Sequence, residues 1–255
     1  MNEGQLRSKH TWNWTFRTAR QSCRRLRGHT NRETLTLGWH YPSMCNDYER
    51  HVSREPFNAA LESAGLTLIS SGPQPAVAPA ADVRVGDTAP VLVTEGNGVA
   101  LVPMRWGFSP SRLRGAPVFN FRGDGRRFGT SQRCVIPASA FFEFSGTRSP
   151  KSKWRFTVPG EQVLGIAGLW HREADNAHFT MLTVKPGPDV RPFHDRQIAI
   201  LRPAEWGHWL YLSKPEAELI RSLPSGSLAV DLARPGVEAP APELMALADA
   251  RAPTT

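Results

Sequence analysis

The pair Met44-Cys45 has the clearest chemical potential in this sequence. If the bond between these residues is cut, or if translation begins at Met44, Cys45 carries both a thiol and a free α-amine. The amine can condense with an aldehyde to an imine, on which the thiolate closes to a five-membered thiazolidine; the amine can also activate its own thiol. The alternative is that Cys45 is a small buried residue, as free cysteines often are.

Two further residues have side chains suited to acid–base chemistry. His194 precedes the apolar segment Ile198–Leu201 and is followed by an acid and an arginine, so its imidazole is expected to titrate near physiological pH beside both charges. Glu143 lies among phenylalanines in Ala140–Phe144, where an ionised carboxylate is costly to bury unless it is paired or functional. A structural histidine, and a glutamate turned to solvent by strand alternation, are the ordinary alternatives.

Arginines and aromatic residues gather in two stretches. The first contains Arg105 and Trp106; the second, residues 118–133, contains four arginines, among them Arg122 and Arg126. Guanidinium groups bind phosphates and flat rings stack on bases, as a groove for single-stranded nucleic acid requires. An arginine-rich loop that is simply solvated is the alternative interpretation.

Strands and short helices are expected to position these residues. Residues 53–65 predict a helix with a proline in its first turn, and residues 71–90, with four prolines, predict a long extended loop. Val91–Thr94 and Val99–Val102 flank a glycine-containing loop and predict a β-hairpin that leads to Arg105.

The second half of the sequence is rich in apolar segments typical of strands. Two short helices that begin with proline are predicted over Pro203–Tyr211 and Pro215–Ser222. The Pro/Ala-rich tail, residues 231–255, is predicted to be irregular apart from a turn of helix at Glu243–Ala248. The further strands are predicted at residues 140–144, which Cys134–Pro137 enters, and at residues 154–158, 163–170, 179–184 and 198–201.

Length and composition favour one soluble domain. A chain of 255 residues with 40% hydrophobic residues can bury a substantial core, and no apolar run approaches the length of a bilayer span. Cys23, Cys45 and Cys134 have neither disulfide nor metal-ligand spacing, which favours a reducing, cytoplasmic setting and predicts no metal site. We also expect no cofactor.

The net charge of +8 is concentrated at the start of the chain. Residues 1–43 hold eight Lys/Arg and two acidic residues, which leaves +2 for residues 44–255. An anion site in the folded part must therefore be a local patch. The basic leader, residues 1–43, lacks the apolar core of a secretory signal. It could be an organellar transit peptide, a nucleic-acid-binding arm or an extension from a wrongly chosen start codon; we favour the last and expect the mature protein to lack it.

Six motifs within residues 44–222 recur together, in order, in one known family. They are Met44-Cys45-Asn46, Pro103–Phe108, Asn120-Phe121-Arg122, Cys134–Ala138 with Phe141–Phe144, Ile166–Trp170 and His194-Asp195-Arg196. In order and spacing they closely resemble the SRAP family, the SOS response-associated peptidases, also described as abasic-site processing proteins. The resemblance implies a single α+β domain over residues 44–230, with a curved, barrel-like, mostly antiparallel sheet and flanking short helices.

The resemblance also assigns roles to the reactive residues. Cys45, exposed by loss of Met44, would form a thiazolidine with the ring-opened sugar aldehyde of an abasic site in single-stranded DNA. Asn120 would orient the nucleophile and the sugar, Glu143 would lie near the α-amine, and His194 would act as acid or base beside the sugar.

The same resemblance gives Trp106, Arg122 and Arg196 a role in DNA binding. Trp106 would stack on a base, and the two arginines would hold the DNA backbone. Arg105 and Arg126 join them as DNA-binding candidates because they lie in the same arginine-rich stretches.

Two motifs depart from the family pattern. Where the family often has Met-Cys-Gly-Arg, this chain has Asn46-Asp47 after the cysteine, so one backbone contact is lost or moved. The stretch from Asn120 to Asp124 keeps the family's asparagine and arginine but has a shorter acid. Chemistry at the α-amine also requires that the 43-residue leader be absent.

The expected function is therefore abasic-site sensing and covalent crosslinking in an SOS-type DNA damage response. The partner would be single-stranded DNA, with no membrane or metal involved, and the protein would be a cytoplasmic monomer that associates with the nucleoid at damage. One alternative is a cysteine peptidase or amidohydrolase that uses Cys45 with His194 as base and Asn120 as orienter. Another is a DNA-binding module without chemistry.

Overall fold

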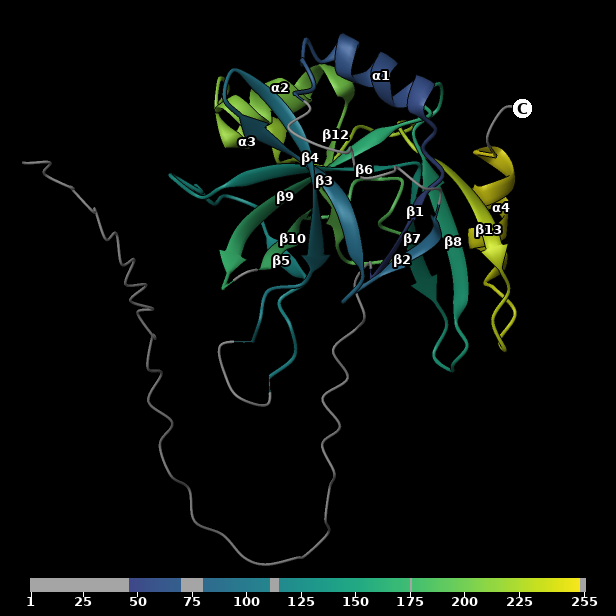
Figure 1. Cartoon of the computed structure of the whole chain (residues 1–255). Coiled ribbons are helices and arrows are strands. Elements are labelled where there is room, and N and C mark those ends of the chain that lie inside the picture. The colour runs from purple at the N-terminus through teal and green to yellow at the C-terminus, as the bar shows by residue number, and fades with distance from the viewer. Residues whose placement is uncertain (1–45, 70–79, 111–114, 175, 253–255) are drawn as a thin grey trace, which may run out of the picture. The chain divides into compact units, whose positions relative to one another are not determined.

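Two β-sheets make up most of the fold (Figure 1). The computed structural model describes residues 46–69, 80–110, 115–174 and 176–252. The smaller sheet is antiparallel throughout and has five strands in the order β13-β8-β7-β1-β2. Its strands are β1 (Asp47–Arg50), β2 (Ala80–Arg84), β7 (Ala140–Ser145), β8 (Ser152–Thr157) and β13 (Ala229–Arg234).

The larger sheet has eight strands and closes on itself. Five strands form a barrel-like ring, because β10, β4, β3, β6 and β9 pair in that order and β9 pairs again with β10. The pairings of β10 with β4 and with β5 are parallel; the others are antiparallel. The strands are β3 (Thr88–Glu95), β4 (Gly98–Trp106), β5 (Asn120–Arg122), β6 (Arg133–Ala138), β9 (Leu164–Glu173), β10 (Asn176–Val184), β11 (Gln197–Ile198) and β12 (Ile200–Leu201).

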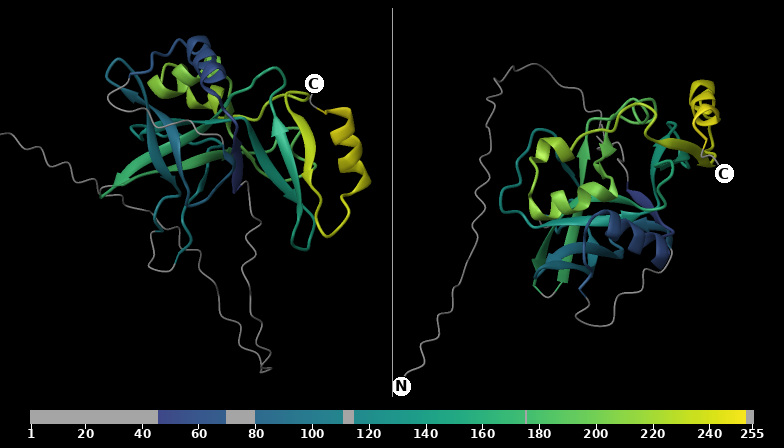
Figure 2. Two further views of the ribbon diagram at one scale, coloured as in Figure 1. Left: turned by 45° about the vertical axis from the view of Figure 1, so that its right-hand side comes forward. Right: turned by 90° about the horizontal axis from the view of Figure 1, so that it is seen from above.

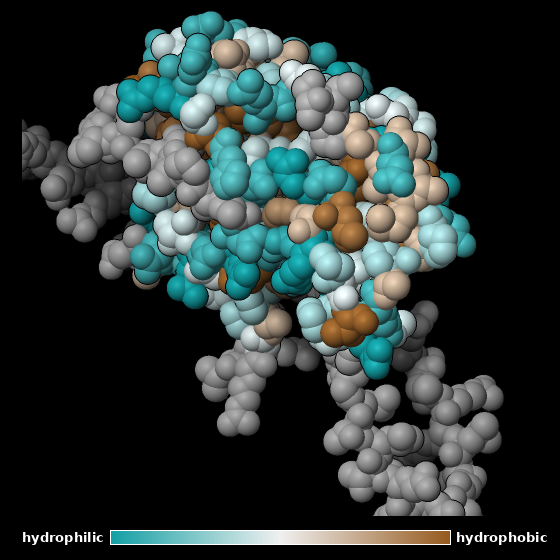
Figure 3. All heavy atoms as spheres, turned by 90° about the vertical axis from the view of Figure 1, so that its right-hand side faces the viewer, coloured by the Kyte–Doolittle hydropathy of each residue, from teal (hydrophilic) through white to brown (hydrophobic). Residues whose placement is uncertain are grey.

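Short helices flank the sheets (Figure 2). They are α1 (Arg54–Ser63), α2 (Pro203–Tyr211), α3 (Glu216–Leu219) and α4 (Pro242–Ala250). Helices α1 and α2 pack together, and α4 packs against β13. Helix α1 buries Phe57, Ala60 and Leu61, whose spacing gives it one apolar face. On the face that carries β13 and α4, hydrophilic residues predominate and apolar ones lie in small groups (Figure 3).

Two hydrophobic clusters account for the apolar strands. One lies between the sheets and includes Tyr48 and Trp154; the other includes Phe57 of α1 and Trp206 of α2. On β6, Ile136 belongs to the first cluster and its neighbour Val135 to the second. The strand is therefore buried on both faces, which explains why its sequence from Cys134 to Ala138 is continuously apolar rather than alternating.

The predicted architecture is confirmed: the described residues form a single α+β domain with a barrel-like sheet and short helices. The helix after Ser53, the β3–β4 hairpin and the helix Pro203–Tyr211 lie where the sequence predicted them. The second predicted helix is shorter, Glu216–Leu219. The basic leader, residues 1–43, lies outside the described residues.

Two predicted irregular segments contain regular structure. Of residues 71–90, predicted as a loop, 71–79 lie outside the described residues, but β2 and the start of β3 occupy most of the remainder. Pro90 fits in β3 because it lies opposite Pro103 of β4, so neither position has an N–H that needs a partner. In residues 231–255, β13 continues to Arg234 where irregular chain was predicted, whereas α4, Pro242–Ala250, confirms the turn of helix predicted at Glu243–Ala248 and extends it at both ends.

Candidate functional site

The start of β1 is the reference point for the site. Cys45 lies outside the described residues, and Asn46 is the first residue that the structure describes. Strand β1 pairs with β7, with Tyr48 opposite Phe141 and Glu49 opposite Ala140. Extended by two residues, this register places Glu143 opposite Asn46, the residue that follows Cys45.

Glu143 is buried at the centre of the smaller sheet. Its residue is 1% exposed, and its strand lies between β1 and β8, where Trp154 is its partner. The alternative in which alternation turns this side chain to solvent is therefore excluded. A carboxylate at this depth requires polar or charged contacts to remain ionised.

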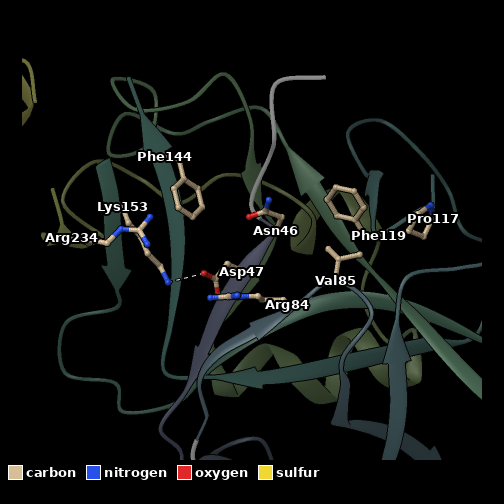
Figure 4. Close-up of a pocket in the computed structure, with 9 residues that line it drawn as sticks. All are labelled: Asn46, Asp47, Arg84, Val85, Pro117, Phe119, Phe144, Lys153 and Arg234. Carbon is tan, nitrogen blue, oxygen red and sulfur yellow. Dashed lines mark ion pairs between the residues drawn. The ribbon is translucent and has the colours of Figure 1, made fainter. Parts of the chain in front are cut away.

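A cavity of about 500 Å³ opens beside the start of β1 (Figure 4). Figure 4 shows Asn46 between Phe144 of β7 on one side and Phe119, just before β5, on the other. The other lining residues are Asp47, Arg84, Val85, Pro117, Lys153 and Arg234. The residue after Cys45 therefore borders a space that is lined by two aromatic rings and more cations than acids.

Ion pairs crosslink the strands at one side of this cavity. The Lys153 Nζ lies 2.6 Å from Asp47 Oδ2 and also contacts the carboxylate of Asp82, which pairs with Arg84 at 3.1 Å. Burial raises the pKa of Asp47, and this outweighs the opposing effect of Lys153. For Asp82, burial also acts to raise the pKa, but Lys153 and Arg84 outweigh it and hold the pKa low.

Asn120 begins β5 at the opposite side of the cavity. Parallel pairing with β10 places Asn120 beside Met181 and Arg122 beside Thr183. The preceding residue, Phe119, lines the cavity and accepts a hydrogen bond of 2.9 Å from the Trp106 indole N–H. Asn120 is half-buried, directly after a lining residue.

His194 follows a core phenylalanine. The Phe193 ring packs edge-on against Trp154, the β8 partner of Glu143, with ring centroids 4.9 Å apart. The His194 side chain is 9% exposed; its Nδ1 accepts a hydrogen bond of 3.1 Å from the Arg196 backbone N–H. Burial lowers the pKa of His194, although the Asp195 carboxylate opposes this. Burial therefore favours the neutral form of the imidazole, whose Nδ1 also lies 3.1 Å from Asp195 Oδ1.

The structure thus brings the predicted catalytic positions to neighbouring elements. Glu143 lies opposite Asn46 by register, and Asn120 follows a residue of the cavity that Asn46 also lines. Phe193, which precedes His194, contacts Trp154, and Trp154 is the β8 partner of Glu143. His194 and Glu143 are therefore connected through these two aromatic residues.

Trp106 does not have the predicted role of stacking on a base. It is 1% exposed and lies in the core between the sheets. Its ring contacts Tyr48 edge-on at 5.5 Å and stacks on Phe179 at 6.1 Å. The indole fills this core because its one N–H is satisfied by the Phe119 carbonyl, so the ring is not accessible to DNA.

The predicted DNA-binding arginines fall into two groups. Arg105, Arg122 and Arg126 are exposed, and the Arg126 guanidinium lies 4.9 Å from the centre of the Phe121 ring. In contrast, Arg196 is 11% exposed and its Nη1 lies 2.6 Å from Asp124 Oδ2.

Arg196 therefore has a structural partner rather than a free guanidinium. Its Nη2 donates to the Thr183 carbonyl at 2.8 Å, so the side chain ties the loop after β5 to β10. Burial acts to raise the pKa of Asp124, but bonds from the Lys185 backbone N–H and from Arg196 outweigh it and lower the pKa. The predicted phosphate contact of Arg196 is not what this geometry supports.

Sequence reasoning did not identify Lys153, Arg84 and Arg234 as site residues. They come from β8, β2 and β13, strands that meet only in the folded sheet. The one signal was at residue 47, where an acid stands in place of a basic residue and so requires a cation nearby.

The described part of the chain has no group of three or more His, Cys, Asp or Glu residues arranged to hold a metal ion. None of its helices is long and apolar enough to cross a membrane.

Comparisons with known proteins identify the family of this chain. Residues 44–234 match the family described as SOS response associated peptidase (SRAP). The chain is 26% identical over 163 residues to the abasic site processing proteins YoqW and YobE of Bacillus subtilis, which covers 57% of this chain and 72% and 74% of theirs.

Solved structures share the fold. A protein from Bordetella bronchiseptica aligns with a TM-score of 0.57 and 22% identity, over 74% of this chain and 100% of that one. A phage-related protein from the same organism aligns with a TM-score of 0.57 and 18% identity, over 77% and 100%. On the match over residues 44–234, the chain belongs to the SRAP family.

Proposed function

We propose that this protein processes abasic sites in single-stranded DNA and forms a covalent thiazolidine crosslink through Cys45, after the chain before it is lost. The relatives named abasic site processing proteins support the substrate. The observation that carries the chemistry is the position of Glu143, buried and opposite Asn46 in the extended β1–β7 register. We take this carboxylate as the group that acts on the α-amine of an amino-terminal Cys45.

The reaction has two bond-forming steps. The α-amine of Cys45 attacks the aldehyde carbon of the ring-opened sugar and water is lost, which gives an imine. The thiol then adds across the imine: sulfur bonds to carbon, and the proton goes to nitrogen. Neither step needs an oxidant or a metal, but both need proton transfers at the amine and at the sugar oxygen.

Each catalytic candidate suits one of these transfers. Glu143, opposite Asn46 in the extended register, is the base that we assign to removing the proton that keeps the α-amine cationic. His194 is neutral at pH 7 because burial lowers its pKa, so it can accept a proton as base and return it as acid when water leaves. Asn120 offers amide donors and an acceptor that orient the sugar.

The intact mass and amino-terminal residue of the purified protein test the first requirement. We expect the active species to begin at Cys45. An active crosslinking species that keeps Met44 contradicts the thiazolidine, because its cysteine has no free α-amine.

The covalent step is tested with single-stranded DNA that contains one abasic site. Wild-type protein should give a species that survives denaturing electrophoresis without reduction. Cys45→Ala keeps an α-amine but loses the thiol, so its imine should be labile unless borohydride reduces it. The control is Cys134→Ala: this thiol is fully buried and burial raises its pKa, so its loss should leave the crosslink intact. A stable, unreduced crosslink of normal yield from Cys45→Ala would contradict the mechanism.

The family's description as a peptidase supports a second candidate activity for the same residues. Cys45, with His194 as base, could hydrolyse a peptide bond. Turnover of a peptide substrate in the absence of DNA would favour this activity over crosslinking.

A further inference from the structure

A second cavity, of about 850 Å³, adjoins the one beside Asn46. It lies where the end of β4 and the loop after it meet β9 and β10, near the turn between β2 and β3. Val85 and Pro117 line both cavities, so the two spaces share a wall. The other lining residues of the second cavity are Gly86, Thr88, Val102, Pro103, Arg105, Trp106, Gly107, Phe108, Ser109, Pro110, Arg172, Asn176, Ala177 and His178.

Among the residues that the structure describes, the lining of this second cavity includes two arginines and no acidic residue. Arg105 and Arg172 are both exposed, and within the described ranges neither makes an ion pair. Their positions are linked through β10, where Arg105 pairs with His178 and Arg172 with Ala177. This patch contrasts with the charge of only +2 on residues 44–255.

Two acids lie close to this cavity: Asp87 stands between the lining residues Gly86 and Thr88 and accepts a hydrogen bond of 2.8 Å from the Arg84 backbone N–H, and Glu173 follows Arg172. Glu173 accepts a hydrogen bond of 3.1 Å from the Ser109 backbone N–H and lies 2.6 Å from His171 Nε2. Burial acts to raise the pKa of Glu173, but these bonds outweigh it and lower the pKa. The Glu173 carboxylate is therefore engaged with Ser109 and His171, and within the described ranges no ion pair joins it to Arg105 or Arg172.

Apolar surface stands beside these cations. Phe108 is half-buried with its ring 4.0 Å from that of His171, and Pro110 and Pro117 are exposed at the same cavity. Guanidinium groups next to flat apolar side chains are the combination that holds an unstacked strand, because phosphates and bases are bound together.

We propose that the second cavity binds the part of the single strand that flanks the abasic nucleotide, with Arg105 and Arg172 each neutralising a phosphate and Phe108 contacting a base. The proposal rests on the proposed function, since it takes the cavity at Asn46 as the place of the reacting sugar. The two cavities adjoin at Val85 and Pro117, and the proposed track of the strand crosses these two residues from one cavity to the other. Arg172 and the cavity around it thereby gain a role that the motifs do not indicate.

The first experiment separates this track from the reacting centre by strand length. Crosslinking is compared on a trinucleotide with a central abasic site and on a 15-nucleotide strand. Arg105→Ala and Arg172→Ala should each raise the half-saturating concentration of the long strand several-fold and leave that of the trinucleotide almost unchanged. Arg54→Ala is the control, because Arg54 is an exposed arginine in α1, away from both cavity linings.

A second experiment uses undamaged strand and Cys45→Ala, so that no chemistry is needed. For single strands the slope of log affinity against log salt is about 0.7 per phosphate contact, so each arginine variant should reduce it by about that amount. Thr88→Glu places an acid in the lining and should weaken binding, whereas the similarly sized Thr88→Gln should not.

The outcomes distinguish the track from the proposed function. The proposed track is wrong if both arginine variants bind and crosslink the long strand like wild type. It is also wrong if their half-saturating concentration rises as much for the trinucleotide as for the long strand. Binding of an acidic peptide in preference to the strand also overturns it. If wild type forms no crosslink but the arginine variants lower the salt slope on undamaged strand, the track stands and the covalent function fails.

Discussion

Lys153 of β8 reaches across a whole strand to meet Asp47 of β1, with Nζ 2.6 Å from Oδ2. Strand β7 lies between them in the sheet, and the ammonium sits 3.7 Å from the centre of the Phe142 ring on that strand. Both side chains are nearly buried, at 10% and 8% exposure. The pair fixes the start of β1, next to Asn46 and the cavity that it lines.

Lys153→Met should destabilise the fold strongly. It leaves the Asp47 carboxylate buried without its nearest cation, and breaking such a pair typically costs about 3–5 kcal/mol. Denaturant unfolding measures the loss. Arg84→Ala is the matched control, because its pair with Asp82 is largely exposed and should contribute at most about 1 kcal/mol.

The double variant Asp47→Asn with Lys153→Met should recover most of that stability, since it removes both buried charges. Strictly additive losses in the two single variants and the double variant would show that the pair does not couple β1 to β8.

The crosslinking rate should fall below pH 6.5 through protonation of His194. Burial lowers the pKa of this imidazole, so the neutral base persists at pH 7 and is lost only in more acidic solution. Asp195→Asn removes a carboxylate that raises this pKa and should move the acidic limb to still lower pH. The measurement is the single-turnover rate against pH, on protein saturated with strand.

His194→Gln should slow that rate by about 10²-fold and abolish the limb attributed to the imidazole. If the fall in rate at acidic pH is unchanged in both Asp195→Asn and His194→Gln, it arises from the titration of another group. The Cys45 α-amine is then the first candidate.

Arg122→Ala and Arg196→Ala should have different effects on DNA binding. Arg122 is exposed, so its loss should reduce the salt slope by about 0.7 for one phosphate. Arg196 is bonded to Asp124 and Thr183, so its loss should destabilise the loop after β5 and leave the salt slope of folded protein nearly unchanged. DNA titrations at several salt concentrations, with unfolding curves for both variants, separate these effects. If Arg196→Ala reduces the salt slope as much as Arg122→Ala does, Arg196 does contact a phosphate.

Glu143→Gln should slow imine formation without preventing binding. The amide has the shape of the carboxylate but cannot take the proton of the α-amine. Trapping with borohydride measures the imine directly. Glu49→Gln is the control, because Glu49 is a buried β1 carboxylate bonded to Arg155 and Ser139; it should cost stability but leave imine formation per folded molecule unchanged.

The fold could be predicted where the signal is local. The β3–β4 hairpin has its turn glycines in sequence, and α2 begins with proline and buries Trp206 and Trp209. By contrast, β13 pairs with β8, far away in the sequence, so nothing in the Pro/Ala-rich tail marks it as a strand.

The site could be predicted in part for the same reason. Motifs indicated Glu143 and His194, and the structure brings their elements together. Burial could not be seen in the motifs: Trp106 looks like a stacking residue beside an arginine but lies in the core, and Arg196 looks like a phosphate ligand but meets Asp124. The pairing of Lys153 with Asp47 depends on the order of the strands in the sheet, which could not be predicted from the sequence.

The closed ring has a consequence for how the protein folds. The pairs β3–β4 and β9–β10 join strands that are adjacent in sequence and can form early, whereas the parallel pair of β10 with β4 joins distant segments and must wait for a long loop to close. Strand β5, which carries Asn120 and Arg122, pairs with the same β10. The strand that presents Asn120 thus depends on a pairing between distant segments, which closes a longer loop than either hairpin does.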